Sequence, residues 1–226
     1  MKYTTLLFDV DDTLLDFKAA EKQALRALFA ELGMELTAEM EQTYKTLNHR
    51  RWAQYEQGTM SSEEVVNGRF GEVFTAFGRE VDSPAMEQRY RHYLNQGHDL
   101  LDNSLEIIQD LATKADLYIV TNGVAETQFK RLTDAQLLPY FKEVFVSETA
   151  GHQKPKQEFF DYAFARIPEL DQSKTVIIGD SLTSDIQGGI NAGIDTIWLS
   201  PNEVTGEIVP TYHIKKLAEI YQILAS

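Results

Sequence analysis

Carboxylates that directly follow short apolar runs are the side chains in this sequence best suited to chemistry. Asp9 and Asp11 come just after the run at residues 4–8, and Asp180 comes just after the run at 175–178. Ligands of a doubly wound sheet bind beyond the carboxyl ends of its strands, so these three carboxylates converge if the two runs are neighbouring parallel strands. Like charges so close repel by several kcal/mol at an effective dielectric constant of about 20. We therefore expect a hard divalent cation there, and Mg²⁺ suits a few carboxylates together with substrate phosphate and water.

The spacing of Asp9 and Asp11 predicts separate roles for the two carboxylates. Two residues apart beyond a strand end, one can attack a substrate while the other exchanges protons with the leaving group. A carboxylate nucleophile that forms an aspartyl-phosphate is an established form of covalent catalysis. Alternatively, Asp9 and Asp11 are two surface acids at the start of a loop. The pair indicates a catalytic site only in combination with suitable residues further along the chain.

Those partners follow in order. Thr121-Asn122-Gly123 ends another apolar run and offers a hydroxyl and backbone N–H groups ahead of a predicted helix, which suits an anion, although the same triplet is a common turn. Lys154 precedes a helix, where its ammonium could neutralise both a phosphate and the crowded aspartates; alone it would be interpreted as a surface lysine. Asp185 follows Asp180 by five positions, with four residues between them. It is either a further acid behind the others at the site or a first-turn helix acid favoured by the dipole.

Two kinds of element must position these residues. Short runs without alternation, typical of parallel strands buried on both faces, occur at residues 4–8, 117–120, 144–146, 175–178 and 196–199. Helical patterns separate or follow them at about 104–114, 124–137, 156–167, 184–192 and 213–225. Alternating strands and helices predict an α/β fold with a doubly wound parallel sheet.

The stretch between Leu15 and about Asp102 contains no strand pattern and predicts helices only. Helices are expected at 18–32, ended by a glycine, at 38–55 and after the capping-box residue Ser61. Another helix is expected to about Gln96, with Ser83 as its N-cap and Pro84 in its first turn. We expect residues 1–15 and 100–226 to form the α/β core and residues 16–99 to form an inserted all-helical cap domain.

Composition narrows the function classes. The chain has 226 residues, a net charge of −14 and no cysteine. Disulfides, thiolate metal sites and a cysteine nucleophile are thereby excluded, and duplex nucleic acid is an unfavourable partner. The apolar N-terminal run is cut by aspartates and no stretch is long enough to span a membrane, so we expect a cytoplasmic protein without membrane contact.

The ordered motifs Asp9-Val10-Asp11-Asp12-Thr13-Leu14, Thr121-Asn122-Gly123, Lys154-Pro155 and Gly179-Asp180-(x)₄-Asp185 together resemble the haloacid dehalogenase-like (HAD) superfamily. The resemblance spans residues 9–185 and is specific as a set. It implies a Rossmann-like core with strand order 5-4-1-2-3 and a helical cap of the C1 type inserted after the first motif. It also implies that the protein is an enzyme, a Mg²⁺-dependent hydrolase of phosphate monoesters.

The resemblance also assigns roles residue by residue. It implies that Asp9 is the nucleophile, that Asp11 is the general acid and base, and that Thr121, Asn122 and Lys154 bind the phosphate. Mg²⁺ would be held by the Asp9 side chain, the Asp11 carbonyl and Asp180, with Asp185 behind them. Two departures from the family pattern concern the loops: Asp12 stands where many members have glycine, and Lys156 stands where an acid is common.

The substrate is predicted less directly. Trp52, Tyr55 and Arg69 lie in segments similar to the pyrimidine 5′-nucleotidase branch of the superfamily, which implies a nucleoside monophosphate as the small phosphorylated substrate. The two aromatic rings could stack on a base and Arg69 could face the substrate; alternatively, all three belong to the interior of the cap. Other open functions are a sugar-phosphate phosphatase, a phosphomutase, a 2-haloacid dehalogenase, which does not need the acid at Asp11, and a non-enzymatic binding protein.

Overall fold

The computed structural model of the protein describes residues 1–225, which form two compact units. The core unit consists of Met1–Asp16 together with the chain from His98 onward. The helical unit consists of Phe17–Gly97. Each unit has a hydrophobic interior of its own.

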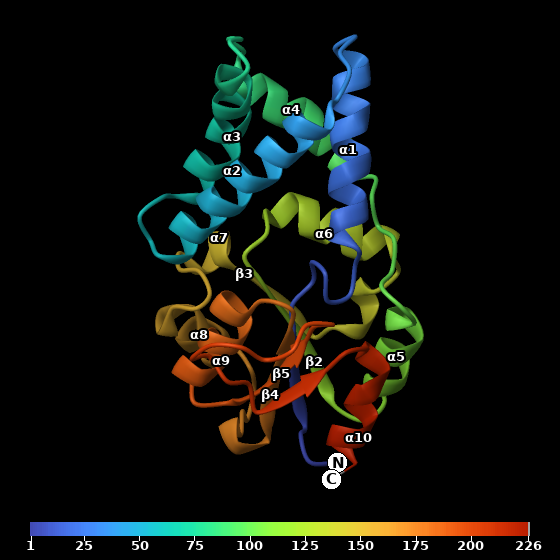
Figure 1. Ribbon diagram of the computed structural model, residues 1–226. Coiled ribbons are helices and arrows are strands. Elements are labelled where there is room, and N and C mark those ends of the chain that lie inside the picture. The colour runs from blue at the N-terminus through green and yellow to red at the C-terminus, as the bar shows by residue number, and fades with distance from the viewer. Residues whose placement is uncertain (226) are drawn as a thin grey trace. The chain divides into compact units, whose positions relative to one another are not determined.

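The core unit is built on a parallel six-stranded sheet (Figure 1). Its strands are β1 (Thr5–Phe8), β2 (Asp116–Thr121), β3 (Glu143–Val146), β4 (Thr175–Gly179), β5 (Asp195–Leu199) and β6 (Tyr212–Ile214). They pair in the order β3-β2-β1-β4-β5-β6. The predicted doubly wound sheet and the order of its first five strands are confirmed, and β6 extends the sheet beyond β5.

Helices cover both faces of this sheet, as Figure 1 shows. Successive residues of β1 point to opposite faces: Leu6 and Phe8 belong to one buried cluster and Leu7 to the other. This is the reason that the strand sequences lack alternation. The helices and short helical turns of the core unit are α5 (Ser104–Leu111), α6 (Ala125–Asp134), η1 (Leu138–Tyr140), α7 (Ser147–Ala150), α8 (Gln157–Phe164), η2 (Gln172–Lys174), η3 (Leu182–Ile186), α9 (Gln187–Asn191), η4 (Leu217–Glu219) and α10 (Ile220–Leu224).

The C-terminal segment corrects one sequence prediction. Residues 213–225 were expected to form a helix, but the segment begins as β6 and becomes helical only at η4 and α10. Ile214 is buried in the strand, and Leu217, Ile220 and Leu224 are buried in the helical turns. The apolar spacing of these residues mimics one continuous helix. A strand of three residues is too short to show its own periodicity.

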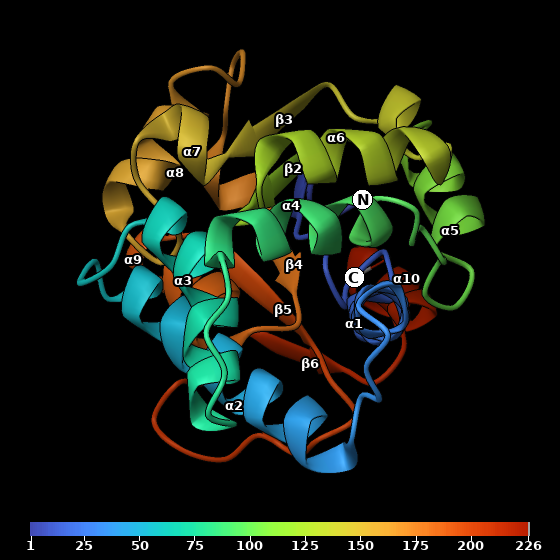
Figure 2. The ribbon, with the colours of Figure 1, turned by 90° about the horizontal axis from the view of Figure 1, so that it is seen from above.

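The helical unit contains α1 (Phe17–Glu31), α2 (Ala38–Glu56), α3 (Ser62–Ala76) and α4 (Ser83–Leu94), all seen in Figure 2. The Ser61–Glu64 capping box forms as predicted, with the Ser61 N–H donating to Glu64 Oε2 at 2.8 Å. The cap of α4 differs from the prediction. Asp82, not Ser83, accepts from the backbone of Ala85, while the Ser83 hydroxyl accepts from the Gly71 N–H at 2.8 Å.

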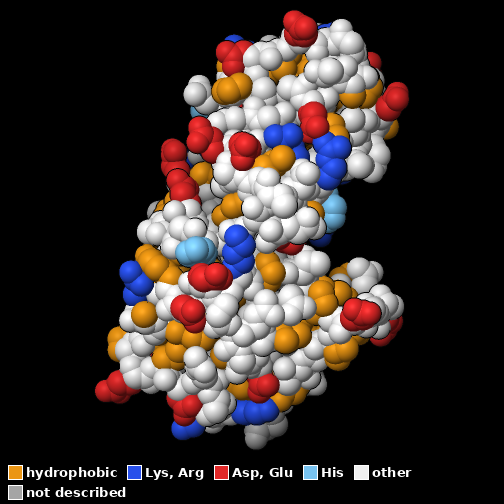
Figure 3. All heavy atoms as spheres, turned by 90° about the vertical axis from the view of Figure 1, so that its left-hand side faces the viewer, with side chains coloured by type: hydrophobic (Ala, Val, Ile, Leu, Met, Phe, Trp, Pro, Cys, Tyr) orange, Lys and Arg blue, Asp and Glu red, His pale blue; other side chains and the backbone are white. Residues whose placement is uncertain are grey.

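Charged side chains of both signs are interspersed on the face shown in Figure 3, with small hydrophobic areas between them. A broad basic surface is absent from this face, consistent with the net charge of −14. Each helix within residues 1–225 is either too short or too polar to cross a membrane.

Candidate active site

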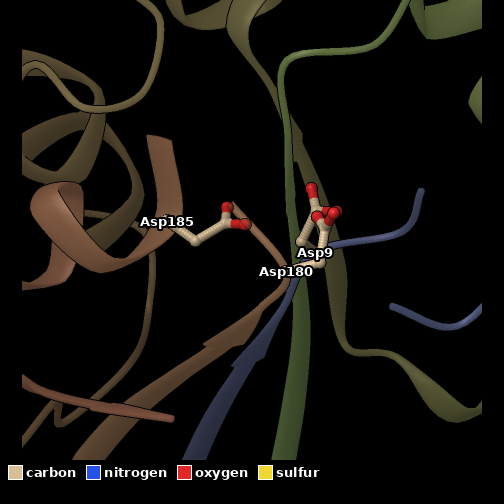
Figure 4. Close-up of side chains that lie close together, drawn as sticks. All are labelled: Asp9, Asp180 and Asp185. Carbon is tan, nitrogen blue, oxygen red and sulfur yellow. The ribbon is translucent and has the colours of Figure 1, made fainter. Parts of the chain in front are cut away.

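The carboxyl ends of β1 and β4 lie next to each other and carry the acidic residues of the first and last motifs. The register pairs Phe8 with Ile178, and the Asp9 N–H donates to the Ile178 carbonyl at 2.9 Å. Oxygens of Asp9, Asp180 and Asp185 all lie within 4.8 Å of one another. Figure 4 shows the carboxylates of Asp9 and Asp180 close together and that of Asp185 directed toward them. The fold therefore gathers three acids from distant stretches of chain at one edge of the sheet.

Lys154 lies among these acids and is almost completely buried, at 1% exposure. Its Nζ contacts Asp9 Oδ1 at 2.8 Å, Asp185 Oδ1 at 2.6 Å and the Val120 carbonyl at 2.7 Å. Burial lowers the pKa of Lys154, but the carboxylates of Asp185 and Asp9 outweigh this effect and raise the pKa above its usual value. Lys154 is therefore a permanent cation, and its three N–H donors all have oxygen partners.

One ammonium does not compensate the whole acidic cluster. Burial raises the pKa of Asp9 to about 7, helped by the charges of Asp185 and Asp11 and opposed by that of Lys154. The ionised form of Asp9 is thus disfavoured by its surroundings. A further positive charge at this point would be strongly favourable.

Asp185 reaches Lys154 because residue 179 has no side chain. A Cβ built on Gly179 would stand 2.2 Å from Asp185 Oδ2 and 2.3 Å from its Cγ. The Asp185 carboxylate also accepts from the Ser181 N–H at 3.1 Å. Glycine is therefore needed at residue 179 for this close approach of Asp185.

The hydroxyl of Thr121 lies at the end of β2 and accepts two hydrogen bonds. Its Oγ1 receives the Gly123 N–H at 3.0 Å and the Gln128 side-chain amide at 2.9 Å. A hydroxyl has two acceptor lone pairs and one proton, so the role left for Thr121 is that of a donor. This polarity suits a phosphate oxygen.

Asn122 has a structural function that its motif did not reveal. Its Oδ1 accepts from the Lys154 N–H at 2.9 Å, and its Nδ2 donates to the Lys154 carbonyl at 3.0 Å and to Ser184 Oγ at 3.3 Å. The side chain therefore fastens the Lys154 backbone to the end of β2. Any contact of Asn122 with substrate would be made by its backbone.

Asp11 is held by two residues of α6 that the sequence motifs did not predict. Gln128 Nε2 donates to Asp11 Oδ2 at 2.7 Å, and Arg131 Nη1 forms an ion pair with Asp11 Oδ1. Both side chains are buried. The sequence carries only a weak signal for this contact. Gln128 and Arg131 are three positions apart on one helix, and this spacing is equally typical of a helix face exposed to solvent.

The backbone at Asp180 is fixed from β5. The indole N–H of Trp198 donates to the Asp180 carbonyl at 2.7 Å, and the ring of His213 stacks on Trp198 with centroids 4.8 Å apart. The unexpected strand β6 thus supports the site through His213. The sequence alone does not predict that Trp198 and His213 support the Asp180 backbone; the packing of the folded chain shows it.

The two departures from the family pattern have local explanations. Asp12 has a φ of 56°, in the left-handed region that glycine adopts freely and aspartate tolerates. Lys156 precedes α8 and its N–H donates to the Gln153 carbonyl at 2.9 Å. Neither residue displaces a member of the acidic cluster.

In the helical unit, Arg69 belongs to the interior. It is 3% exposed and pairs with Glu87 through two hydrogen bonds of 2.8 Å, while its Nη1 donates to Asn48 at 3.1 Å. The alternative that Arg69 is an internal ion-pair partner is therefore the correct one. Trp52 and Tyr55 contact each other edge to face, with centroids 5.6 Å apart.

The model of one family, described as haloacid dehalogenase-like hydrolase, matches residues 6–199. The chain belongs to this family. The match covers both units and includes every motif described above, so the protein is a hydrolase of the HAD type. The resemblance inferred from the motifs is thereby confirmed.

Relatives of known name extend over the whole chain. The protein YfnB of Bacillus subtilis is 52% identical, over 99% of this chain and 96% of its own. Pyrimidine 5′-nucleotidase PynA of Streptococcus pneumoniae is 41% identical, over 99% and 96% respectively. Pyrimidine 5′-nucleotidase YjjG of Escherichia coli is 31% identical, over 99% of both chains.

Solved structures agree with the fold. A crystal structure of YfnB bound to magnesium, which reveals interdomain movement, has a TM-score of 0.96 at 51% identity and covers all of both chains. L-2-haloacid dehalogenase of Xanthobacter autotrophicus has a TM-score of 0.75 at 14% identity, with 99% of both chains covered. The second likeness shows a shared fold alone, because fold does not determine chemistry.

Proposed function

We propose that this protein is a Mg²⁺-dependent phosphate-monoester hydrolase that acts through an aspartyl-phosphate on Asp9. The observation that carries the proposal is the buried contact of Lys154 with Asp9, 2.8 Å long, inside a cluster of acids whose charge one lysine does not balance. A nucleophile facing a dianionic phosphate needs such positive charge beside it.

The acidic cluster fits a Mg²⁺ ion. Oxygens from Asp9 and Asp180 are hard ligands of the kind this cation prefers, and the raised pKa of Asp9 marks where positive charge is lacking. Asp185 is occupied by Lys154 and the Ser181 N–H, so it lies behind the ligands. The Asp11 carbonyl is the third protein ligand implied by the family. When bound, Mg²⁺ would offset the charge of the phosphoryl oxygens and of Asp9.

The chain's own residues account for the bond changes. A carboxylate oxygen of Asp9 attacks phosphorus, and the bond from phosphorus to the ester oxygen breaks as Asp11 donates a proton to that oxygen. Asp11 then removes a proton from water, whose oxygen attacks the phosphorus of the aspartyl-phosphate. Inorganic phosphate leaves, and Asp9 and Asp11 regain their starting states.

Two further residues stabilise the phosphoryl group. The Thr121 hydroxyl donates a hydrogen bond to a phosphoryl oxygen. Lys154, whose three donors are engaged by Asp9, Asp185 and Val120, acts on the phosphate through its charge.

For the substrate we propose a pyrimidine nucleoside 5′-monophosphate. Support comes from the two full-length relatives named pyrimidine 5′-nucleotidase, at 41% and 31% identity. Such a substrate is a small phosphorylated metabolite, and a cytoplasmic location remains the prediction of the sequence. The proposed reaction involves neither a nucleic acid nor a membrane as a partner.

A substrate panel tests the function. Purified protein is assayed for phosphate release from nucleoside monophosphates, sugar phosphates and 4-nitrophenyl phosphate, with Mg²⁺ and with EDTA, and for halide release from 2-haloacids. We expect Mg²⁺-dependent phosphate release, fastest with pyrimidine nucleotides, and no halide. Best turnover of a sugar phosphate, or conversion to an isomeric sugar phosphate, would replace the nucleotidase assignment. Halide release in EDTA would overturn the whole proposal.

A further inference from the structure

Helix α6 presents two buried polar side chains to Asp11. Gln128 and Arg131 are 1% and 0% exposed. One donor from each residue binds one oxygen of the Asp11 carboxylate, Gln128 Nε2 at 2.7 Å and Arg131 Nη1 in an ion pair. Because both oxygens are held, the carboxylate is fixed in rotation as well as in position.

The same amide of Gln128 joins Asp11 to Thr121. Its Nε2 has two protons and contacts Thr121 Oγ1 at 2.9 Å in addition to Asp11. The Oε1 of Gln128 in turn accepts from Arg131 Nη1 at 3.3 Å. The group proposed to transfer protons and the group proposed to bind phosphate are therefore set relative to each other by one side chain.

The turn after β2 is shaped to admit this amide. A Cβ on Gly123 would stand 2.3 Å from Gln128 Nε2 and 2.9 Å from its Cγ, so a side chain at residue 123 would expel Gln128. Burying an arginine is costly without a charged partner, and the ion pair with Asp11 supplies such a partner. A helix that only covered the sheet would need neither a glycine at residue 123 nor a buried ion pair.

We propose that Gln128 and Arg131 are positioning residues that hold the Asp11 carboxylate beside Thr121 for both of its proton transfers. This inference rests on the proposed function. It assigns to α6 a part in the chemistry that is exerted through Asp11, although neither residue belongs to the motifs that mark the family in this sequence.

The two proton transfers give the inference a distinctive signature. An alkyl leaving group, such as the sugar hydroxyl of a nucleotide, needs a proton from Asp11, whereas 4-nitrophenolate leaves without one. Hydrolysis of the aspartyl-phosphate needs Asp11 as base with either substrate. Misplacing Asp11 should therefore slow the first step with nucleotides but only the second step with 4-nitrophenyl phosphate.

The test compares Arg131→Met, Arg131→Lys and Gln128→Met with the wild type. Methionine preserves the apolar bulk of either side chain, and the matched control is Lys130→Met, which removes an exposed cation of the same helix. We expect kcat for the best nucleotide to fall roughly 10- to 100-fold in Arg131→Met and Gln128→Met with little change in KM, and Arg131→Lys to recover part of the loss. Stopped-flow measurements should show nitrophenol released at the wild-type rate in the first turnover, followed by a slow steady state.

Equal slowing of the first nitrophenol turnover and of nucleotide hydrolysis would show a merely structural effect and overturn the inference, as would unchanged kcat in the Gln128 and Arg131 variants. If Arg131→Met does not fold, Gln128→Met and Arg131→Lys decide the question by the same kinetics. A wild type that releases no phosphate from any ester would instead refute the proposed function.

Discussion

The charge of Asp9 is unfavourable in the folded chain even with Lys154 beside it, unless a second cation is bound. Burial and neighbouring carboxylates raise the pKa of Asp9 from 3.8 to about 7. The folded chain therefore holds the proton of Asp9 more tightly than the unfolded chain does. This contribution to stability is complete below the unfolded pKa of 3.8 and is lost as the pH rises through about 7.

Replacing Asp9 by asparagine should for this reason stabilise the metal-free protein. In EDTA at about pH 8.5 we expect Asp9→Asn to be more stable than the wild type by about 1 to 3 kcal/mol, and the difference to shrink at about pH 5.5. Thermal or urea unfolding measures the effect. Asp116→Asn, which changes an exposed acid on β2, is the control. If Asp9→Asn is less stable than the wild type at both pH values, the stabilisation from the Asp9–Lys154 ion pair outweighs the cost of burying the Asp9 charge.

At the scale of elements, the strands were predictable because burial on both faces leaves continuous apolar runs. The insertion was predictable because its helices carry their caps and glycine stops in sequence. The strand β6 was not, since three residues cannot show a period and Ile214 continues the apolar spacing of the helical turns behind it. The N-cap of α4 was misplaced by one residue because Asp82 and Ser83 are equally good capping residues.

Within the helical unit, the Arg69–Glu87 pair ties α3 to α4. Both side chains are 3% exposed, so removal of one leaves the other charged and buried. We expect Glu87→Ala to lower the free energy of unfolding by about 3 to 5 kcal/mol. The double variant Arg69→Met/Glu87→Leu, which removes both charges, should recover most of this loss.

This pair also tests whether Arg69 serves the substrate. Urea unfolding gives the stabilities of the two variants, and steady-state kinetics of the double variant gives its KM. An internal role predicts a KM for nucleotides close to that of the wild type. A large rise in the KM of a well-folded double variant would place Arg69 at the substrate after all.

At the scale of the whole molecule, the site is assembled from residues as far apart as Asp9 and Lys154, which are 145 positions apart. The sequence predicted these residues because strand ends meet at one edge of a parallel sheet. It did not predict Gln128, Arg131 or Trp198, since a polar residue on a helix or an aromatic residue in a strand has many uses. Packing alone distinguishes those uses.

Because the acidic cluster exists only in the folded chain, Mg²⁺ should stabilise the protein. At a free concentration of about 100 times its Kd, a ligand that binds only the folded state contributes about 2.7 kcal/mol. We expect the melting temperature to rise with Mg²⁺ in the wild type and in Asp116→Asn. The rise should vanish in Asp180→Asn. An undiminished rise in Asp180→Asn would place the ion elsewhere.

The aspartyl-phosphate on Asp9 is the central claim, and chemical trapping tests it most directly. The protein is mixed with Mg²⁺ and its best phosphate ester, quenched in acid during turnover and reduced with borohydride, which converts an aspartyl-phosphate to homoserine. Peptide mass spectrometry should find homoserine at position 9, only when the ester is present. Turnover with unmodified Asp9, or homoserine at another aspartate, would contradict the account.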